Sequence, residues 1–195
     1  MMVKICGITK LEDAMAAIEG GASALGFNFY TKSPRYIAPD CAAGLIAKLP
    51  ASVWKVGVFV NESRERITEL ASHVGLDVVQ LVGQADSLPS LRVWQTAHVG
   101  ENFRLADIEN DPAEAILLDT PSSQSYGGTG RTFDWSRAAG STRRIILAGG
   151  LDASNVKQAI AAAQPWGVDI CSRIESSPGR KDHVKMAKFL REAKS

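Results

Sequence analysis

Cysteine is scarce in the sequence, and its three cysteines lie far apart at Cys6, Cys41 and Cys171. No pair has CxxC spacing and none belongs to a cluster with histidine, which argues against a zinc site and against a disulfide framework. We therefore expect a protein with reduced thiols that holds no metal.

An excess of charge of one sign is also missing, because 22 lysines and arginines stand against 21 aspartates and glutamates. Without a basic excess there is no electrostatic footprint for nucleic acid. No apolar run approaches the roughly 20 residues of a membrane span, and no charged leader followed by an apolar run opens the sequence. These absences predict a cytoplasmic protein with no nucleic-acid partner and no membrane partner.

Strand-like and helix-like segments alternate about eight times along the 195 residues, a pattern typical of parallel βαβ units. An open sheet of this length would more often have five or six strands, so we predict an α/β fold with eight strands closed on themselves. The prediction is one compact (β/α)8 TIM barrel over residues 1–195, with shortened links after strands four and five. The expected strands cover residues 3–8, 24–30, 53–60, 77–83, 93–99, 115–120, 144–151 and 167–174.

In such a barrel the active site lies at the carboxyl ends of the strands. Side chains alternate along a strand, so the apolar Val3 and Ile5 suit the helix side of the first strand. Lys4 and Cys6 then face inward, with Cys6 nearer the carboxyl end. Asp119 ends the sixth strand, where a carboxylate after an apolar run is costly to bury without a purpose or a partner.

Two other strand ends suit an anion. Gly149 and Gly150 allow a close approach of the backbone, and the polar stretch 176–183 follows the eighth strand. Loops after strands seven and eight are a recurrent phosphate site in barrels. Each feature alone also fits a structural role, because strand cysteines are commonly buried and Gly-Gly pairs are commonly turns. We further expect Thr9 to cap the helix after the first strand and His98 to be packed.

Taken together and in this order, the motifs resemble the phosphoribosylanthranilate isomerase family from the first strand to the last helix. They are KICGIT, LGFNF followed by SPR, VGVFV, VVQL, LLDT, GGTGRTFDW, LAGGL and ESSPGRKD.

The resemblance implies an isomerase of tryptophan biosynthesis. It would convert N-(5-phosphoribosyl)anthranilate to 1-(2-carboxyphenylamino)-1-deoxyribulose 5-phosphate by an Amadori rearrangement. No metal or organic cofactor is implied, because the imine of the substrate acts as the electron sink. The implied partner is this phosphorylated small molecule, with the protein a monomer or a homodimer.

By position in these motifs, Asp119 corresponds to the general acid of the family and Cys6 to its general base. Arg35 corresponds to the arginine that faces the anthranilate carboxylate, an anion that suits a guanidinium fork. The glycines of the 121–130 loop suggest a lid that closes over the substrate. The implied phosphate and sugar site comprises Gly149, Gly150, Asp169, Ser172 and Arg173.

Two positions depart from the family pattern, and so does the abbreviated link after strand four. Val82 stands where a histidine is usual, and Arg173 stands where a glycine is usual. Arg173 has three open placements: outward into solvent, as a clamp on the phosphate, or as a block of the site. Two other functions stay open as well. One is a different phosphosugar aminoaldose–ketose isomerase on the same barrel, and the other is a barrel with lost or weakened turnover that only binds ligand.

Overall fold

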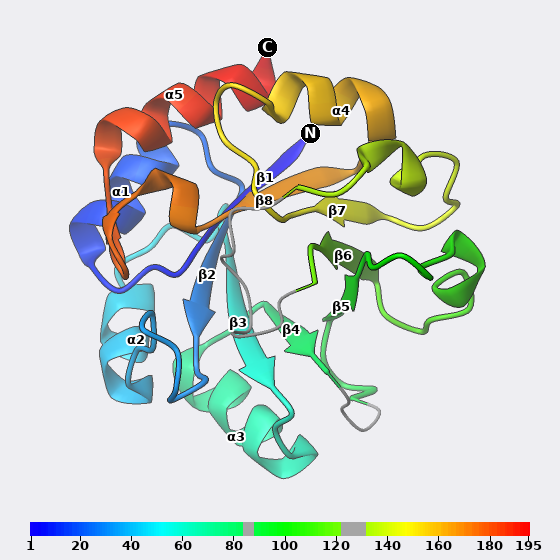
Figure 1. Ribbon diagram of the computed structural model, residues 1–195. Helices are drawn as coiled ribbons and strands as arrows, with labels where there is room; N and C mark the ends of the chain where they lie inside the picture. The colour runs from blue at the N-terminus through cyan, green and yellow to red at the C-terminus, as the bar shows by residue number, and fades with distance from the viewer. Residues whose placement is uncertain (84–87, 122–131) are drawn as a thin grey trace.

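Eight parallel strands form a closed barrel in the computed structural model, which describes residues 1–83, 88–121 and 132–195 (Figure 1). The strands neighbour one another in chain order, and the first pairs with the eighth to close the ring. The predicted (β/α)8 barrel is confirmed. Its strands are β1 (Met2–Cys6), β2 (Ala24–Asn28), β3 (Trp54–Val60), β4 (Val78–Val82), β5 (Val93–His98), β6 (Ala115–Asp119), β7 (Ile145–Leu147) and β8 (Gly167–Ile170).

The α-helices lie on the outside of the barrel (Figure 1). They are α1 (Leu11–Glu19), α2 (Pro39–Ile46), α3 (Arg64–Val74), α4 (Val156–Ala163) and α5 (His183–Lys194). Between β4 and β5 the described residues form no helix, and β5 is followed only by the 3-10 helix η1 (Leu105–Asp107). The predicted shortened links are therefore present. In the described part of the link after β6, the helical element is the 3-10 helix η2 (Trp135–Ala138). Within the described ranges, no helix is long and apolar enough to cross a membrane.

Alternation along the strands separates two apolar regions. Val3 and Ile5 belong to the core between the strands and the helices, as their phase predicts. The inward side chains in the amino-terminal half of the barrel are also apolar. Trp94 and Leu117 are almost fully buried there. Burying a large apolar side chain contributes about 1.5–3 kcal/mol, so this packing gives the barrel a firm floor. Above that floor the inward side chains become polar: Lys4, Gln80, Thr96 and Asp169.

The segment after β8 differs from the prediction. The strand ends at Ile170, and it is followed by the 3-10 helix η3 (Ser172–Ile174) and a hairpin of β9 (Glu175–Ser177) and β10 (Arg180–Lys181). The prediction that Thr9 caps α1 is wrong, because the cap position is Lys10 and has no side-chain cap bond. The Thr9 hydroxyl instead donates to the Gly179 carbonyl at 2.5 Å. This bond joins the β9–β10 hairpin to the segment between β1 and α1.

Both ends of the chain lie on one side of the molecule. Met1 and Ser195 border the same surface hollow, together with residues of α4 and α5 (Figure 1). Met1 directly precedes β1, so this hollow lies at the amino ends of the strands. The carboxyl ends, where a barrel carries its active site, point away from it.

Candidate active site

A pocket opens to solvent at the carboxyl ends of the strands. The structure places all of the site residues predicted from the sequence around it, while their chemical roles stay predictions. They are Cys6, Arg35, Asp119, Gly149, Gly150, Asp169, Ser172 and Arg173.

Cys6 lies above a buried ion pair on one side of this pocket. Below it, the fully buried Lys4 Nζ donates to Asp169 Oδ1 at 2.8 Å. The neighbouring Cys171 thiol lowers the pKa of Cys6 most, burial opposes it, and the Lys4 cation lowers it further, to about 6. Cys6 is therefore largely a thiolate at neutral pH, the form in which a cysteine acts as a base or nucleophile.

Asp119 lies on the other side of the pocket, at the end of β6. Burial raises the pKa of its carboxyl, although a 2.7 Å hydrogen bond from the Thr120 backbone N–H to Oδ1 works in the other direction. Asp169 raises this pKa further by repulsion between the two carboxylates. A carboxyl that keeps its proton more readily than usual is suited to act as an acid.

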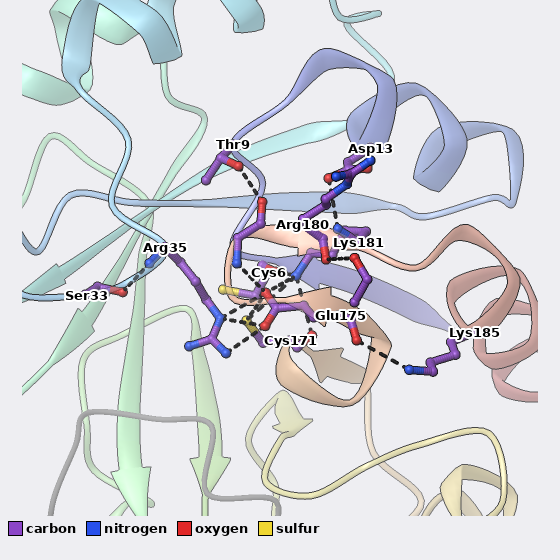
Figure 2. A network of polar contacts seen from close by, with 12 residues as sticks. Cys6, Thr9, Asp13, Ser33, Arg35, Cys171, Glu175, Arg180, Lys181 and Lys185 are labelled. Carbon is purple, nitrogen blue, oxygen red and sulfur yellow. Dashed lines mark hydrogen bonds and ion pairs between the residues drawn. The ribbon is translucent and has the colours of Figure 1, made fainter.

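A buried ionic network holds Arg35 at the rim of the pocket (Figure 2). Arg35 Nε donates to Glu175 Oε1 at 3.0 Å, and Nη2 donates to Glu175 Oε2 at 2.7 Å. This fork-to-carboxylate geometry fixes the direction of the guanidinium. The contact of Arg35 with an anthranilate carboxylate stays a prediction.

Lys181 of β10 is the second cation of the network, and the sequence reasoning missed it. Its side chain is fully buried, and Nζ lies 3.0 Å from Glu175 Oε1. Nζ also donates to the Cys6 carbonyl at 2.6 Å (Figure 2). Burial works against the charge of Glu175, but Arg35 and Lys181 outweigh it and lower the pKa of that carboxyl. The sequence signal was the lysine of PGRKD, although nothing local shows that it turns inward.

The backbone after β7 forms the corner predicted to hold phosphate. Gly149 and Gly150 have φ values of +75° and +65°, a region that side chains rarely adopt. A Cβ added to Gly149 would lie 2.3 Å from Thr120 Oγ1, so only glycine fits against β6. Arg173 is exposed and borders the pocket on the β8 side of this corner.

The remaining wall comes from β3, β4 and β5. Val82 packs with Val58 in a small apolar cluster that Cys6 also touches. Below it, Gln80 Nε2 donates to Thr96 Oγ1 at 3.2 Å. His98 is exposed and borders the pocket, so the prediction that it is packed is wrong. It ends its strand, and no segment among the described residues covers it there.

The described residues contain no group of three or more histidine, cysteine, aspartate or glutamate side chains that could hold a metal ion. The loop predicted to act as a lid lies outside the described residues from position 122 onward, and so does the GGTG motif.

Comparison with known sequences decides the family. A sequence model of N-(5'-phosphoribosyl)anthranilate isomerase matches residues 3–192. This chain belongs to the phosphoribosylanthranilate isomerase family. The isomerase of Solibacter usitatus is 54% identical over 198 residues, which cover 100% of this chain and 98% of that one. The isomerase of Thermotoga maritima is 42% identical and covers 98% of each chain.

Solved structures of phosphoribosylanthranilate isomerases have the same fold. One from Thermotoga maritima has a TM-score of 0.90 at 41% identity, over 100% of this chain and 98% of that chain. Another was solved in complex with reduced 1-(o-carboxyphenylamino)-1-deoxyribulose 5-phosphate. It has a TM-score of 0.86 at 38% identity, over 100% of this chain and 98% of that chain.

Within the phosphoribosylanthranilate isomerase family, this chain carries its two departures on the pocket wall. Val82, in place of the usual histidine, lies on the apolar side beside Val58 and Cys6. Arg173, in place of the usual glycine, lies beside Ser172 at the predicted phosphate corner. Both departures therefore change the lining of the pocket.

Proposed function

We propose that this chain catalyses the Amadori rearrangement of N-(5'-phosphoribosyl)anthranilate in tryptophan biosynthesis, with Asp119 as general acid and Cys6 as general base. The observation that carries the proposal is a pair of opposite pKa shifts in one pocket. The thiol pKa of Cys6 is lowered to about 6, while burial raises that of the Asp119 carboxyl. An acid and a base that face one substrate need shifts in these directions.

In the first step, Asp119 gives its proton to the ring oxygen of the ribose as the bond between C1 and that oxygen breaks. The nitrogen lone pair forms the C1=N bond, which leaves an open-chain Schiff base. The raised pKa of Asp119 favours this step, because the carboxyl must be protonated when the substrate arrives.

In the second step, the Cys6 thiolate takes the proton from C2. The electrons of that C–H bond form C1=C2, and those of the C=N bond return to nitrogen. The resulting enaminol gains a proton at C1 and loses its hydroxyl proton, which gives the aminoketose. The substrate's own imine accepts the electrons, so this route uses no metal or organic cofactor.

The rest of the pocket supplies binding. We assign the anthranilate carboxylate to Arg35, whose guanidinium is already oriented by Glu175. The phosphate is assigned to the backbone at Gly149 and Gly150, with Ser172 and Arg173 on the other side. Asp169 borders the space between the acid and the base, where the sugar hydroxyls would lie.

The test is the decay of anthranilate fluorescence when phosphoribosylanthranilate is generated in situ. The wild-type protein should accelerate the decay above spontaneous breakdown. Cys6→Ser and Asp119→Asn should each lower kcat by about 10²- to 10⁴-fold, the usual contribution of one acid or base. Matched controls are Cys41→Ser and Asp40→Asn, which change an exposed cysteine and an exposed aspartate of α2 outside the pocket.

A wild-type rate no faster than spontaneous breakdown contradicts the isomerase proposal and favours a barrel that only binds ligand. A wild-type rate in Cys6→Ser refutes Cys6 as the base, and a wild-type rate in Asp119→Asn refutes Asp119 as the acid. Turnover of another phosphorylated aminoaldose, without turnover of phosphoribosylanthranilate, points to the alternative isomerase.

A further inference from the structure

Strand register brings two of the three cysteines together. In the pairing of β1 with β8, Lys4 lies opposite Asp169 and Ile5 lies opposite Ile170. Cys6 is the last residue of β1, and Cys171 is the first residue after β8. Neighbouring strands lie about 4.7–4.9 Å apart, within the range of about 4.4–6.8 Å between the Cα atoms of a disulfide.

Both cysteines border the same pocket. Lys4 and Asp169 meet inside the barrel. Cys6 follows Lys4 by two residues on the same face of β1, and Cys171 follows Asp169 by two residues, just beyond the end of β8. Cys6 and Cys171 both border the pocket and are half-buried, so a small solute in the pocket can reach them. The Cys171 sulfur is also close to the residue after Cys6, because a Cβ added to Gly7 would lie 3.0 Å from it.

The two thiols shift each other's pKa in opposite directions. Cys171 is the largest cause that lowers the pKa of Cys6, and Cys6 together with burial raises the pKa of Cys171 well above its usual range. Lys181 Nζ lies 3.9 Å from the Cys171 sulfur (Figure 2). A thiolate beside a second thiol is the arrangement in which oxidation ends as a disulfide rather than as a higher acid.

We propose that Cys6 and Cys171 form a reversible intramolecular disulfide when the protein meets a peroxide. The Cys6 thiolate attacks one peroxide oxygen, the O–O bond breaks, and Cys6 becomes a sulfenic acid while hydroxide leaves and takes up from the solvent the proton that Cys6 had released, which gives water. The Cys171 sulfur then attacks the Cys6 sulfur and the S–O bond breaks. The departing hydroxide takes the Cys171 proton as water. Two thiols are oxidised by two electrons, and one hydrogen peroxide is reduced to two waters.

The functional consequence rests on the proposed function. Cys6 is the proposed base, and a disulfide removes its thiolate, so an oxidised molecule would not isomerise its substrate. A dithiol such as dithiothreitol reverses the bond by thiol–disulfide exchange. The modification itself depends only on the two cysteines and does not require the chain to be an isomerase.

The experiment uses the full chain with Cys41→Ser, so that the third and exposed thiol cannot react. After hydrogen peroxide and alkylation of free thiols, the intact mass should fall by two hydrogen atoms and neither cysteine should be alkylated. A non-reducing tryptic digest should join residues 5–10 to residues 158–173. Dithiothreitol should restore both peptides and the original mass.

The matched control adds Cys171→Ser to the same chain, and each protein is compared with its own untreated sample. This variant should gain oxygen on Cys6 and should not lose two hydrogens. Two free thiols after peroxide, or Cys6 carrying only added oxygen in the chain that keeps Cys171, overturns the disulfide. The mass readout separates this inference from the proposed function. A disulfide in a protein without isomerase activity refutes the function alone, and an isomerase without the disulfide refutes the modification alone.

Discussion

At the scale of single residues, Cys6 predicts a pH dependence. Its pKa of about 6 means that the base is protonated and inactive below pH 6 and available above it. The value of kcat/KM should therefore rise as the pH increases through about 6. Asp119 must keep its proton, so its raised pKa sets a fall at higher pH. The measurement is the pH profile of kcat/KM, which reports the free enzyme.

A variant checks the origin of that profile. Lys4→Met removes a cation that lowers the pKa of Cys6, so the rising limb should move to higher pH. A profile without a rising limb near pH 6, or one that Cys6→Ser leaves unchanged, argues against the thiolate as the base.

Arg173 gives a second prediction at this scale. It borders the pocket beside Ser172, which favours the clamp over the outward placement. A hydrogen bond to a charged group contributes about 1.5–3 kcal/mol, so Arg173→Gly should raise KM about tenfold or more. Because this contact lies far from the reacting carbons, kcat should change little. An unchanged KM contradicts both the clamp and the block, and a lowered KM identifies Arg173 as a block.

At the scale of elements, the β9–β10 hairpin depends on one buried cation. Lys181 is fully buried and pairs with Glu175, and its backbone N–H donates to Asp13 Oδ2 at 3.0 Å. Removing one partner of a buried pair typically costs about 3–5 kcal/mol. Lys181→Met should therefore lower the free energy of unfolding by about that amount, measured by urea denaturation.

The matched control is Lys185→Met, four residues further on in α5. Its side chain is 55% exposed, where Nζ lies 3.5 Å from Asp182 Oδ2 and makes a long 3.4 Å hydrogen bond to the Glu175 carbonyl, so it carries no buried charge. Exposed substitutions of this kind usually change stability by less than about 0.5 kcal/mol. Equal losses in the two variants would show that the Lys181 pair is not what holds the hairpin.

The elements also show where sequence reasoning succeeds. The strands were predicted because apolar alternation and glycine stops are local, and phase alone placed Cys6 and Asp119 inside the barrel. The sequence did not predict the hairpin after β8, because β10 has only two residues. The position of β10 depends on contacts with Asp13 and Thr9, which are far away in sequence. For the same reason Thr9 was assigned to a cap, Lys181 was overlooked, and His98 was expected to be packed.

At the scale of the whole molecule, the pocket is built from both ends of the chain. Its residues come from β1 as well as β8, and one outer core extends from Val3 to Ala193. A ligand that binds only the folded barrel should therefore stabilise the chain as one unit. Reduced 1-(o-carboxyphenylamino)-1-deoxyribulose 5-phosphate at 100 times its Kd should add about 2.7 kcal/mol to the free energy of unfolding.

Urea denaturation, followed in parallel by tryptophan fluorescence and far-UV circular dichroism, measures this shift. Both signals should move together if residues 1–195 form the single domain that the sequence predicts. Two transitions, of which the ligand moves only one, would divide the chain into separately folding parts.

Because Met1 and Ser195 border the same hollow, the two ends of the chain could be joined. A short glycine-rich linker between them should allow circular permutation, with new ends cut into the exposed turn at Pro50–Ser52. Exposed loops tolerate such cuts best. The joined ends lie at the amino ends of the strands, so a linker or a fused partner there would leave the mouth of the pocket open. The same geometry offers a tethering point for immobilising the protein on a surface with its site facing the solvent.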